Sequence, residues 1–371
     1  MSAPTPPRIL ICARPAVGGA GRVLEALLRR LPERGISGTA ALSGTEGLAL
    51  IDVARQHGWD TVRLDLRREI SPVRDAGAGL KLRRLARGHD IVHAHAAKAG
   101  ALARLALPLR KGVPVIYSPH GFFFTYHDEG SVPWRRYLAL EQRLAPRTTL
   151  LHCVSAAERD VAVEHGLATE EACHVLPNPV PPRIARRNTE LADLPTDRPL
   201  VVMVARLVPP KDPLTFVRAA AHVPQARFVL VGDGELAAPA RAAAKAANTD
   251  VLFLPPETPV RALLARTRVA VLTTASEALP LFLIEALAEG IPAVTTNLPG
   301  CRDAAADAAL YIPPNDAPAL AAAITRLLAD APLHTRLTTA AHARAPHFEE
   351  TAWTDGLVAM YDRVLHGQKS R

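Results

Sequence analysis

Residues 268–296, RVAVLTTASEALPLFLIEALAEGIPAVTT, alternate between strand and helix patterns and predict one β-loop-α-β unit. Residues 268–274 form a short apolar run rich in β-branched side chains, and residues 291–296 return to that pattern. Between them a helix is predicted with Pro280 at its first position and Gly290 near its end, where these residues are favoured. Two strands joined by a helix in this way lie parallel in one sheet.

Two glutamates flank the start of this predicted helix. Glu277 lies in the loop before it and Glu285 lies in its second turn. The free N–H groups of a helix start favour an anion such as phosphate, and a carboxylate nearby can accept hydrogen bonds from hydroxyl groups. The pair predicts a nucleotide-sugar site, with one glutamate for sugar hydroxyls and one for ribose. The alternative is that Glu277 stabilises the helix dipole and Glu285 is an incidental surface residue.

The same alternation of strand and helix patterns runs through the rest of the chain. Helical spacing is seen, for example, in residues 20–34 and 98–110. Strand patterns occupy residues 8–13, 90–95, 113–118, 149–155, 200–205, 227–232, 251–254, 268–274 and 291–296. This order predicts an α/β fold class with two doubly wound, Rossmann-like domains, whose ligands lie at the carboxyl ends of the strands.

One proline-rich stretch, PNPVPPRIARRNTELADLPTDRP (177–199), interrupts the alternation and predicts the interdomain linker. A chain of 371 residues also fits two domains of similar size. The predicted boundaries are a first domain, a linker, a second domain and a C-terminal helix that packs back toward the first domain. They span residues 1–180, 181–199, 200–347 and 348–371.

Composition favours a folded, intracellular protein. Hydrophobic residues make up 49% and charged residues 22% of the chain. The N-terminus has only a short apolar segment that includes Arg14, so we expect no signal peptide or membrane span. Cys12, Cys153, Cys173 and Cys301 lie far apart without CxxC spacing, which favours a reducing, cytoplasmic location over a zinc site or disulfide framework.

The net charge of +8 is concentrated in the first half of the chain. Residues 1–190 carry 27 Lys and Arg against 18 Asp and Glu, whereas residues 191–371 carry 17 against 18. A nucleic-acid binder would explain the charge and would show steeply salt-dependent DNA binding. Because the arginines show no aromatic interleaving or known motif, we expect no nucleic-acid partner.

Two cations follow the first strand of the second domain in VARLVPPKDP (204–213). Arg206 ends the strand and Lys211 precedes a helix predicted to begin near Pro213. A guanidinium and an ammonium suit the two phosphates of a nucleoside diphosphate. Since no Asp-x-Asp motif lies nearby, these cations and the helix start must neutralise the diphosphate, and we expect no metal or other cofactor.

A series of motifs resembles the retaining glycosyltransferases of family 4, which have the GT-B fold of two domains facing across a cleft. In the second half these are VARLVPPKDP, FVLVGDGEL, SEALPLFLIEALAEGIPAV and LPGCRDAAADAALYIPPND. In the first half VGGAGRVLEALLRRL, DIVHAHAAKAGALARLAL, VPVIYSPHGFFF and HVLPNPV are similar to members that build bacterial surface polysaccharides.

The resemblance implies transfer of a hexose-type sugar from a nucleoside-diphosphate sugar to an acceptor hydroxyl, in polysaccharide or glycolipid biosynthesis. It also implies front-face transfer with retention, in which the departing phosphate takes the acceptor proton. Two alternatives stay open: a tailoring enzyme for a small soluble natural product, and a non-hydrolysing nucleotide-sugar epimerase, which also has two such domains.

The implied donor site consists of Gly18, Gly19, Arg206, Lys211, Glu277, Ala278, Leu279 and Glu285. In the family's arrangement Glu277 contacts the transferred sugar and Glu285 the ribose. Arg206 and Lys211 hold the diphosphate, and the glycine pair permits close backbone approach. Family members usually have glycine at the position of Ala278.

The implied catalytic residues are Glu277, Arg206, Lys211 and His120. His120 ends a predicted strand of the first domain and would face the transferred sugar, with a structural histidine as the alternative. His93 and His95 would form part of the cleft wall.

The acceptor side is basic and aromatic. KLRRLARGH (81–89) and WRRY (134–137) concentrate positive charge, and HGFFFTYH (120–127) adds aromatics. This combination suits a lipid-linked, anionic acceptor and peripheral contact with an anionic membrane at the inner face of the cell membrane. The alternative is that the three phenylalanines pack beneath the loop and the arginines form a solvated face.

Overall fold

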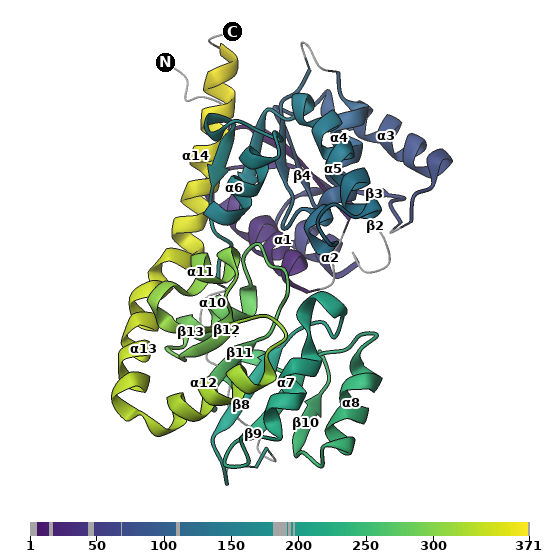
Figure 1. The fold of residues 1–371 in the computed structure, drawn as a ribbon. Coiled ribbons are helices and arrows are strands. Elements are labelled where there is room, and N and C mark those ends of the chain that lie inside the picture. Colours follow the sequence, from purple (N-terminus) through teal and green to yellow (C-terminus); the bar gives the residue numbers. More distant parts are fainter. Residues whose placement is uncertain are drawn as a thin grey trace. The chain divides into compact units, whose positions relative to one another are not determined.

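The computed structural model describes residues 6–14, 18–43, 48–67, 69–108, 112–180, 191, 194–195 and 197–369. The chain forms two compact units. The first combines Met1–Pro179 with Glu350–Arg371, and the second is Val180–Glu349. Each unit has one parallel sheet with helices between its strands (Figure 1). This arrangement confirms the predicted α/β class with two doubly wound domains.

The first unit has a seven-stranded sheet in the order β3-β2-β1-β4-β5-β6-β7. Its strands are β1 Arg8–Ala13, β2 Ser37–Ser43, β3 Asp60–Leu64, β4 Ile91–His95, β5 Val115–Ser118, β6 Leu150–Cys153 and β7 Cys173–Val175. Its helices are α1 Gly19–Arg30, α2 Leu48–Gln56, α3 Pro72–Ala86, α4 Ala97–Ala106, α5 Val132–Leu144, α6 Ala156–Glu164 and α14 Glu350–Lys369. The strand order reverses between β1 and β4, so the carboxyl ends of these strands form the ligand-binding edge.

The second unit has a six-stranded sheet in the order β10-β9-β8-β11-β12-β13. Its strands are β8 Leu200–Val204, β9 Arg227–Val231, β10 Val251–Leu254, β11 Thr267–Leu272, β12 Ala293–Thr296 and β13 Ala309–Ile312. Its helices are α7 Pro213–Ala220, α8 Ala237–Ala246, α9 Val260–Leu264, α10 Leu281–Ala288, α11 Pro299–Ala305, α12 Ala317–Ala329 and α13 Ala331–Arg344. Here the order reverses between β8 and β11, which places the expected ligand edge beside Arg206 and Glu277.

The C-terminal segment forms the last helix, α14. Its residues belong to the first unit, although they follow the second unit in sequence. Glu350 accepts a 2.7 Å hydrogen bond from Nε of Arg30 on α1, and Tyr361 is fully buried. Among the residues that the structure describes, no helix combines the length and apolarity needed to cross a bilayer.

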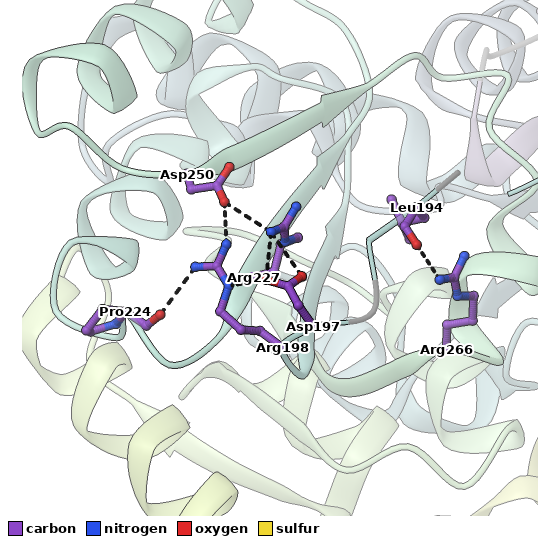
Figure 2. Close-up of polar contacts among 7 residues, drawn as sticks. All are labelled: Leu194, Asp197, Arg198, Pro224, Arg227, Asp250 and Arg266. Atoms are coloured by element: carbon purple, nitrogen blue, oxygen red, sulfur yellow. Dashed lines mark hydrogen bonds and ion pairs between the residues drawn. The ribbon is translucent and has the colours of Figure 1, made fainter. Parts of the chain in front are cut away.

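Charged residues lie at the amino ends of β8, β9 and β10, as Figure 2 shows. Arg198 bonds to the carboxylates of Asp197 and Asp250, and Arg227 contacts the same two carboxylates at 3.0 and 3.4 Å. This edge is opposite the ligand-binding edge of the parallel sheet. The cluster therefore fastens the beginning of the second unit to its sheet without taking part in the site.

Candidate functional site

The loops that leave β8 and β11 are fastened together by side-chain hydroxyls. Thr273 Oγ1 donates to the carbonyl of Asp212 at 2.7 Å, and Thr274 Oγ1 donates to the carbonyl of Pro210 at 2.7 Å. The N–H of Ala275 also donates to Pro210, at 2.8 Å. These bonds fix the turn that carries Lys211 beside the loop that carries Glu277.

Lys211 and Glu277 form an ion pair between Nζ and Oε1. Their side chains are only 18% and 11% exposed, so water screens the pair incompletely. The turn before α7 orients Lys211, because Asp212 adopts a left-handed φ of 43° and caps the helix through the N–H of Thr215. Sequence reasoning gave these two residues separate ligand contacts; the structure brings them together, each as the partner of the other.

Arg206 is exposed in the loop after β8, and a Gly-Asp-Gly turn supports that loop. A Cβ at Gly232 would lie 1.9 Å from the Ala205 carbonyl oxygen, and one at Gly234 would lie 2.4 Å from that of Leu207. The N–H of Leu207 in turn donates to the Asp233 carbonyl at 2.8 Å. Both glycines are therefore required for the close approach that holds the Arg206 loop.

Glu285 lies on a helix that is otherwise apolar and buried. The side chain is 6% exposed, and its neighbours Phe282, Leu283, Ile284, Ala286 and Leu287 are buried. The interpretation of Glu285 as an incidental surface residue is wrong, because a carboxylate in such surroundings is costly unless it is bound by other groups.

The predicted helix start also needs correction. α10 begins at Leu281, and Pro280 precedes it with an extended backbone at φ −75° and ψ 113°. Leu279 is buried, so its side chain is not open to a donor. Ala278 is partly buried, and its carbonyl oxygen would lie 2.5 Å from a Cβ at Gly300, the second residue of α11.

In the first unit the predicted glycine pair stands at the start of α1. Gly18 caps the helix with φ 94° and ψ −141°, and Gly19 is its first residue. A Cβ at Gly18 would meet nothing within 4 Å, so the positive φ is what requires glycine there. Residues 15–17 lie outside the described residues.

Behind the site of the first unit runs a directional chain of buried hydrogen bonds. His152 Nε2 lies 3.1 Å from the carbonyl of Leu176, which can only accept, so neutral His152 presents Nδ1 as an acceptor to Ser118. Ser118 Oγ then accepts from His93 Nε2 at 2.7 Å, and Tyr361 donates to His93 Nδ1 at 2.8 Å. One tautomer for each histidine satisfies every hydrogen bond of this chain. The chain connects Tyr361 of α14 to side chains of the three strands β4, β5 and β6.

His95 and His120 form a second pair beside this chain. His95 Nδ1 and His120 Nε2 lie 3.0 Å apart, and the rings stack with centroids 5.3 Å apart. The other nitrogens, His95 Nε2 and His120 Nδ1, have no hydrogen-bond partner within the described part of the chain. His120 has a left-handed φ of 55°.

Burial keeps these histidines neutral. It lowers the pKa of His120 to about 4 and, with a smaller contribution from the neighbouring rings, that of His152 to about 3. The pKa values of His93 and His95 also lie well below their usual range, mainly through burial. A neutral imidazole can offer a hydrogen bond to a sugar hydroxyl without bringing a charge.

The aromatic loop after His120 is only partly exposed. Phe122 and Phe124 are buried against Leu138 and Leu151, so for these two the alternative of phenylalanines packed beneath the loop is the correct one. Phe123 is 39% exposed and meets Tyr137 edge to face, with centroids 4.6 Å apart. The arginines of the acceptor-side prediction are exposed on α3 and α5: Arg83, Arg84, Arg135 and Arg136.

Two further features concern metal and sulfur chemistry. No group of three or more His, Cys, Asp or Glu side chains within the described ranges is arranged to hold a metal ion. All four cysteines are buried as thiols.

Two parallel α/β units, with cations and carboxylates at the ligand edge of the second sheet, define a GT-B type protein. Family comparison agrees: residues 17–183 match the description Glycosyltransferase Family 4, and residues 187–344 match Glycosyl transferases group 1. The chain belongs to this family of glycosyltransferases.

Relatives with similar sequences act on several acceptors. An Escherichia coli UDP-Gal:alpha-D-GlcNAc-diphosphoundecaprenol alpha-1,3-galactosyltransferase is 31% identical over 255 residues, 63% of this chain and 65% of the relative. A D-inositol 3-phosphate glycosyltransferase from Acidothermus cellulolyticus is 29% identical over 75% of this chain and 68% of its own length. The chain thus spans about two thirds of these relatives.

Solved structures share the fold over nearly the whole chain. Anabaena HepE in complex with UDP superposes with a TM-score of 0.77 at 19% identity, covering 96% of this chain and all of that one. WaaG, a glycosyltransferase involved in lipopolysaccharide biosynthesis, has a TM-score of 0.72 at 17% identity, covering 96% of this chain and 99% of its own. At these identities the likeness establishes the GT-B fold.

Proposed function

We propose that the chain transfers a hexose from a UDP-sugar to a lipid-linked acceptor, with retention at the anomeric carbon. The observation that carries the proposal is the meeting of Lys211 and Glu277 in the loops that leave β8 and β11, with buried Glu285 on the helix that follows. The E. coli relative is named for a UDP-galactose donor and a diphosphoundecaprenol-linked acceptor, and HepE structures contain UDP or UDP-glucose.

The ion pair gives the donor site a simple order of events. An arriving diphosphate competes with Glu277 for Lys211, and Arg206 adds a bidentate donor from the exposed loop. Once Lys211 turns to phosphate, the carboxylate of Glu277 is released to accept hydrogen bonds from the sugar. Donor binding thereby brings Lys211 to the leaving diphosphate and frees the carboxylate of Glu277 to accept hydrogen bonds from the sugar hydroxyls.

Chemistry at the sugar then depends on position and charge rather than on a protein nucleophile. Arg206 and Lys211 stabilise the negative charge that develops on the leaving diphosphate. Neutral His120 donates to a hydroxyl of the transferred sugar, and the departing phosphate oxygen accepts the proton of the acceptor hydroxyl as the new bond forms on the same face.

The acceptor side of the proposal rests on α3 and α5. Besides the four exposed arginines, these helices expose Val73 by 86%, Leu80 by 60% and Val132 by 62%. Apolar side chains beside cations suit the interface of an anionic membrane, where each cation contributes about 1 kcal/mol. We therefore place the protein peripherally at the inner face of the cell membrane.

Liposome co-sedimentation tests the acceptor side. Binding to vesicles with anionic lipids should fade as salt rises and should fall on charge reversal at Arg83, Arg84, Arg135 and Arg136. Efficient transfer to a small neutral acceptor without vesicle binding would instead identify a tailoring enzyme.

Thermal-shift screening tests the donor side, because a ligand that binds only the folded chain raises its melting temperature. UDP and one UDP-sugar should raise it more than other nucleoside diphosphates, and Lys211→Met should abolish the shift. Isomerisation of the sugar without transfer would support the epimerase alternative over our proposal.

A further inference from the structure

A buried glutamate connects α6 to the loop that carries His120. Glu158 is 3% exposed, and its two carboxylate oxygens accept from different loops. Oε1 lies 2.6 Å from the N–H of Gly121, and Oε2 lies 2.8 Å from the N–H of Val154. The carboxylate thus bridges the chain segments that follow β5 and β6.

Helix capping alone does not explain this glutamate. Ser155 is the N-cap of α6 and accepts from the N–H of Glu158 at 3.1 Å. A glutamate three residues after such a cap usually returns to the N–H of the cap residue itself. Glu158 reaches past Ser155 to Gly121, although burial raises the pKa of its carboxyl to about 7 and so makes the charged form costly.

The loop that Glu158 holds has an uncommon backbone. His120 and Gly121 follow one another with φ of 55° and 97°. A left-handed conformation costs a residue with a side chain on the order of 1 kcal/mol, so it persists only where surrounding contacts impose it. The imidazole of His120 is held by His95, and the peptide beyond it is held by Glu158.

We propose that Glu158 is a positioning residue, which fixes the backbone at Gly121 and thereby aims the imidazole of His120 at the transferred sugar. This inference rests on the proposed function, in which His120 contacts that sugar. It assigns Glu158 no contact with substrate.

The first test needs no ligand. Glu158→Leu has a similar size but removes both acceptors, including the one for the N–H of Gly121, and Ser155→Ala weakens the same helix end without removing the bond to Gly121. Hydrogen exchange of the Gly121 amide should rise about tenfold or more in Glu158→Leu and stay near wild type in Ser155→Ala. Unchanged exchange of the Gly121 amide in Glu158→Leu would overturn the proposal.

The second test is a kinetic cycle with UDP-galactose and UDP-glucose, followed as UDP release. Glu158→Leu should lower kcat about tenfold to a hundredfold with little change in KM, the usual result of a misplaced group. In a His120→Ala background the substitution of Glu158 should lower kcat by less than about threefold, because the residue that Glu158 positions is already absent.

The outcomes separate the two ideas. An equal loss of kcat in both backgrounds, or the same loss in Ser155→Ala, would overturn the role of Glu158 and leave the proposed function standing. Full activity of His120→Ala would instead refute the part assigned to His120, and a positioning role for Glu158 would fall with it.

Discussion

Replacing Glu277 by glutamine should separate binding of the diphosphate from binding of the sugar. In the ligand-free protein Glu277 pairs with Lys211, and both side chains are largely shielded from water. UDP offers nothing for Glu277 to bind, and its phosphates need Lys211. A UDP-sugar offers hydroxyls that only a released Glu277 can accept.

The expected effects on the two ligands therefore differ in direction. A charge-assisted hydrogen bond contributes about 1.5–3 kcal/mol, and each 1.4 kcal/mol changes affinity about tenfold. Glu277→Gln should bind UDP as tightly as wild type or up to about tenfold more tightly, because Lys211 no longer gives up a charged partner. Relative to UDP, the UDP-sugar should lose roughly tenfold to a hundredfold in affinity.

Calorimetry with UDP and UDP-galactose measures both affinities on one sample. Glu289→Gln, which removes a charge just past the end of the same helix, is the matched control and should change neither. Loss of affinity by one factor for both ligands would refute the reasoning, since Glu277 would then act only by orienting Lys211.

Three further results are expected. Glu285→Gln should weaken UDP and UDP-sugar alike by about 1.5–3 kcal/mol, because the contact assigned to it is with the ribose that both share; unchanged calorimetry would remove that assignment. Transfer should survive EDTA, since protein cations neutralise the diphosphate, and loss restored by magnesium or manganese would contradict this. Folding lowers the pKa of His93, His95, His120 and His152. Below about pH 6.5 the unfolded chain therefore binds more protons than the folded chain, and the free energy of unfolding decreases as the pH is lowered. The raised pKa of Glu158 partly offsets this effect. The free energy of unfolding, measured by urea denaturation, should decrease by roughly 3 kcal/mol between pH 7.5 and pH 5.5. A free energy of unfolding that does not change over this range would show that the histidines are not held neutral.

The sequence predicts those strands whose apolar runs are long enough to stand out. The strands at 8–13 and 251–254 have the predicted bounds, and the others differ by one or two residues at an end. It misses β2, β3, β7 and β13, whose residues are small, polar or few. These segments extend because a neighbouring strand pairs with them, as β1 does with residues 37–42 of β2, and single-chain periodicity contains no such information.

For the candidate site, the sequence predicts which residues lie near one another but not which of them form contacts. Both Lys211 and Glu277 follow strands of one sheet, so their nearness can be expected, but that each is the other's partner depends on the hydroxyls of Thr273 and Thr274 that tie their loops together. His93, Ser118, His152 and Tyr361 come from four elements, and no spacing in the sequence relates them.

Gly300 in LPGCRD shows how a close contact of the candidate site becomes visible only in the fold. The sequence has Ala278 where family members usually have glycine, and a side chain there would hinder backbone approach to the sugar. In the structure the close approach on that loop comes from the other side: a Cβ at Gly300 would lie 2.4 Å from the Glu277 carbonyl oxygen. The start of α11 can therefore pack directly against the peptide that carries Glu277, and Gly300 rather than residue 278 is the position where a side chain would displace the loop and, with it, the ion pair to Lys211.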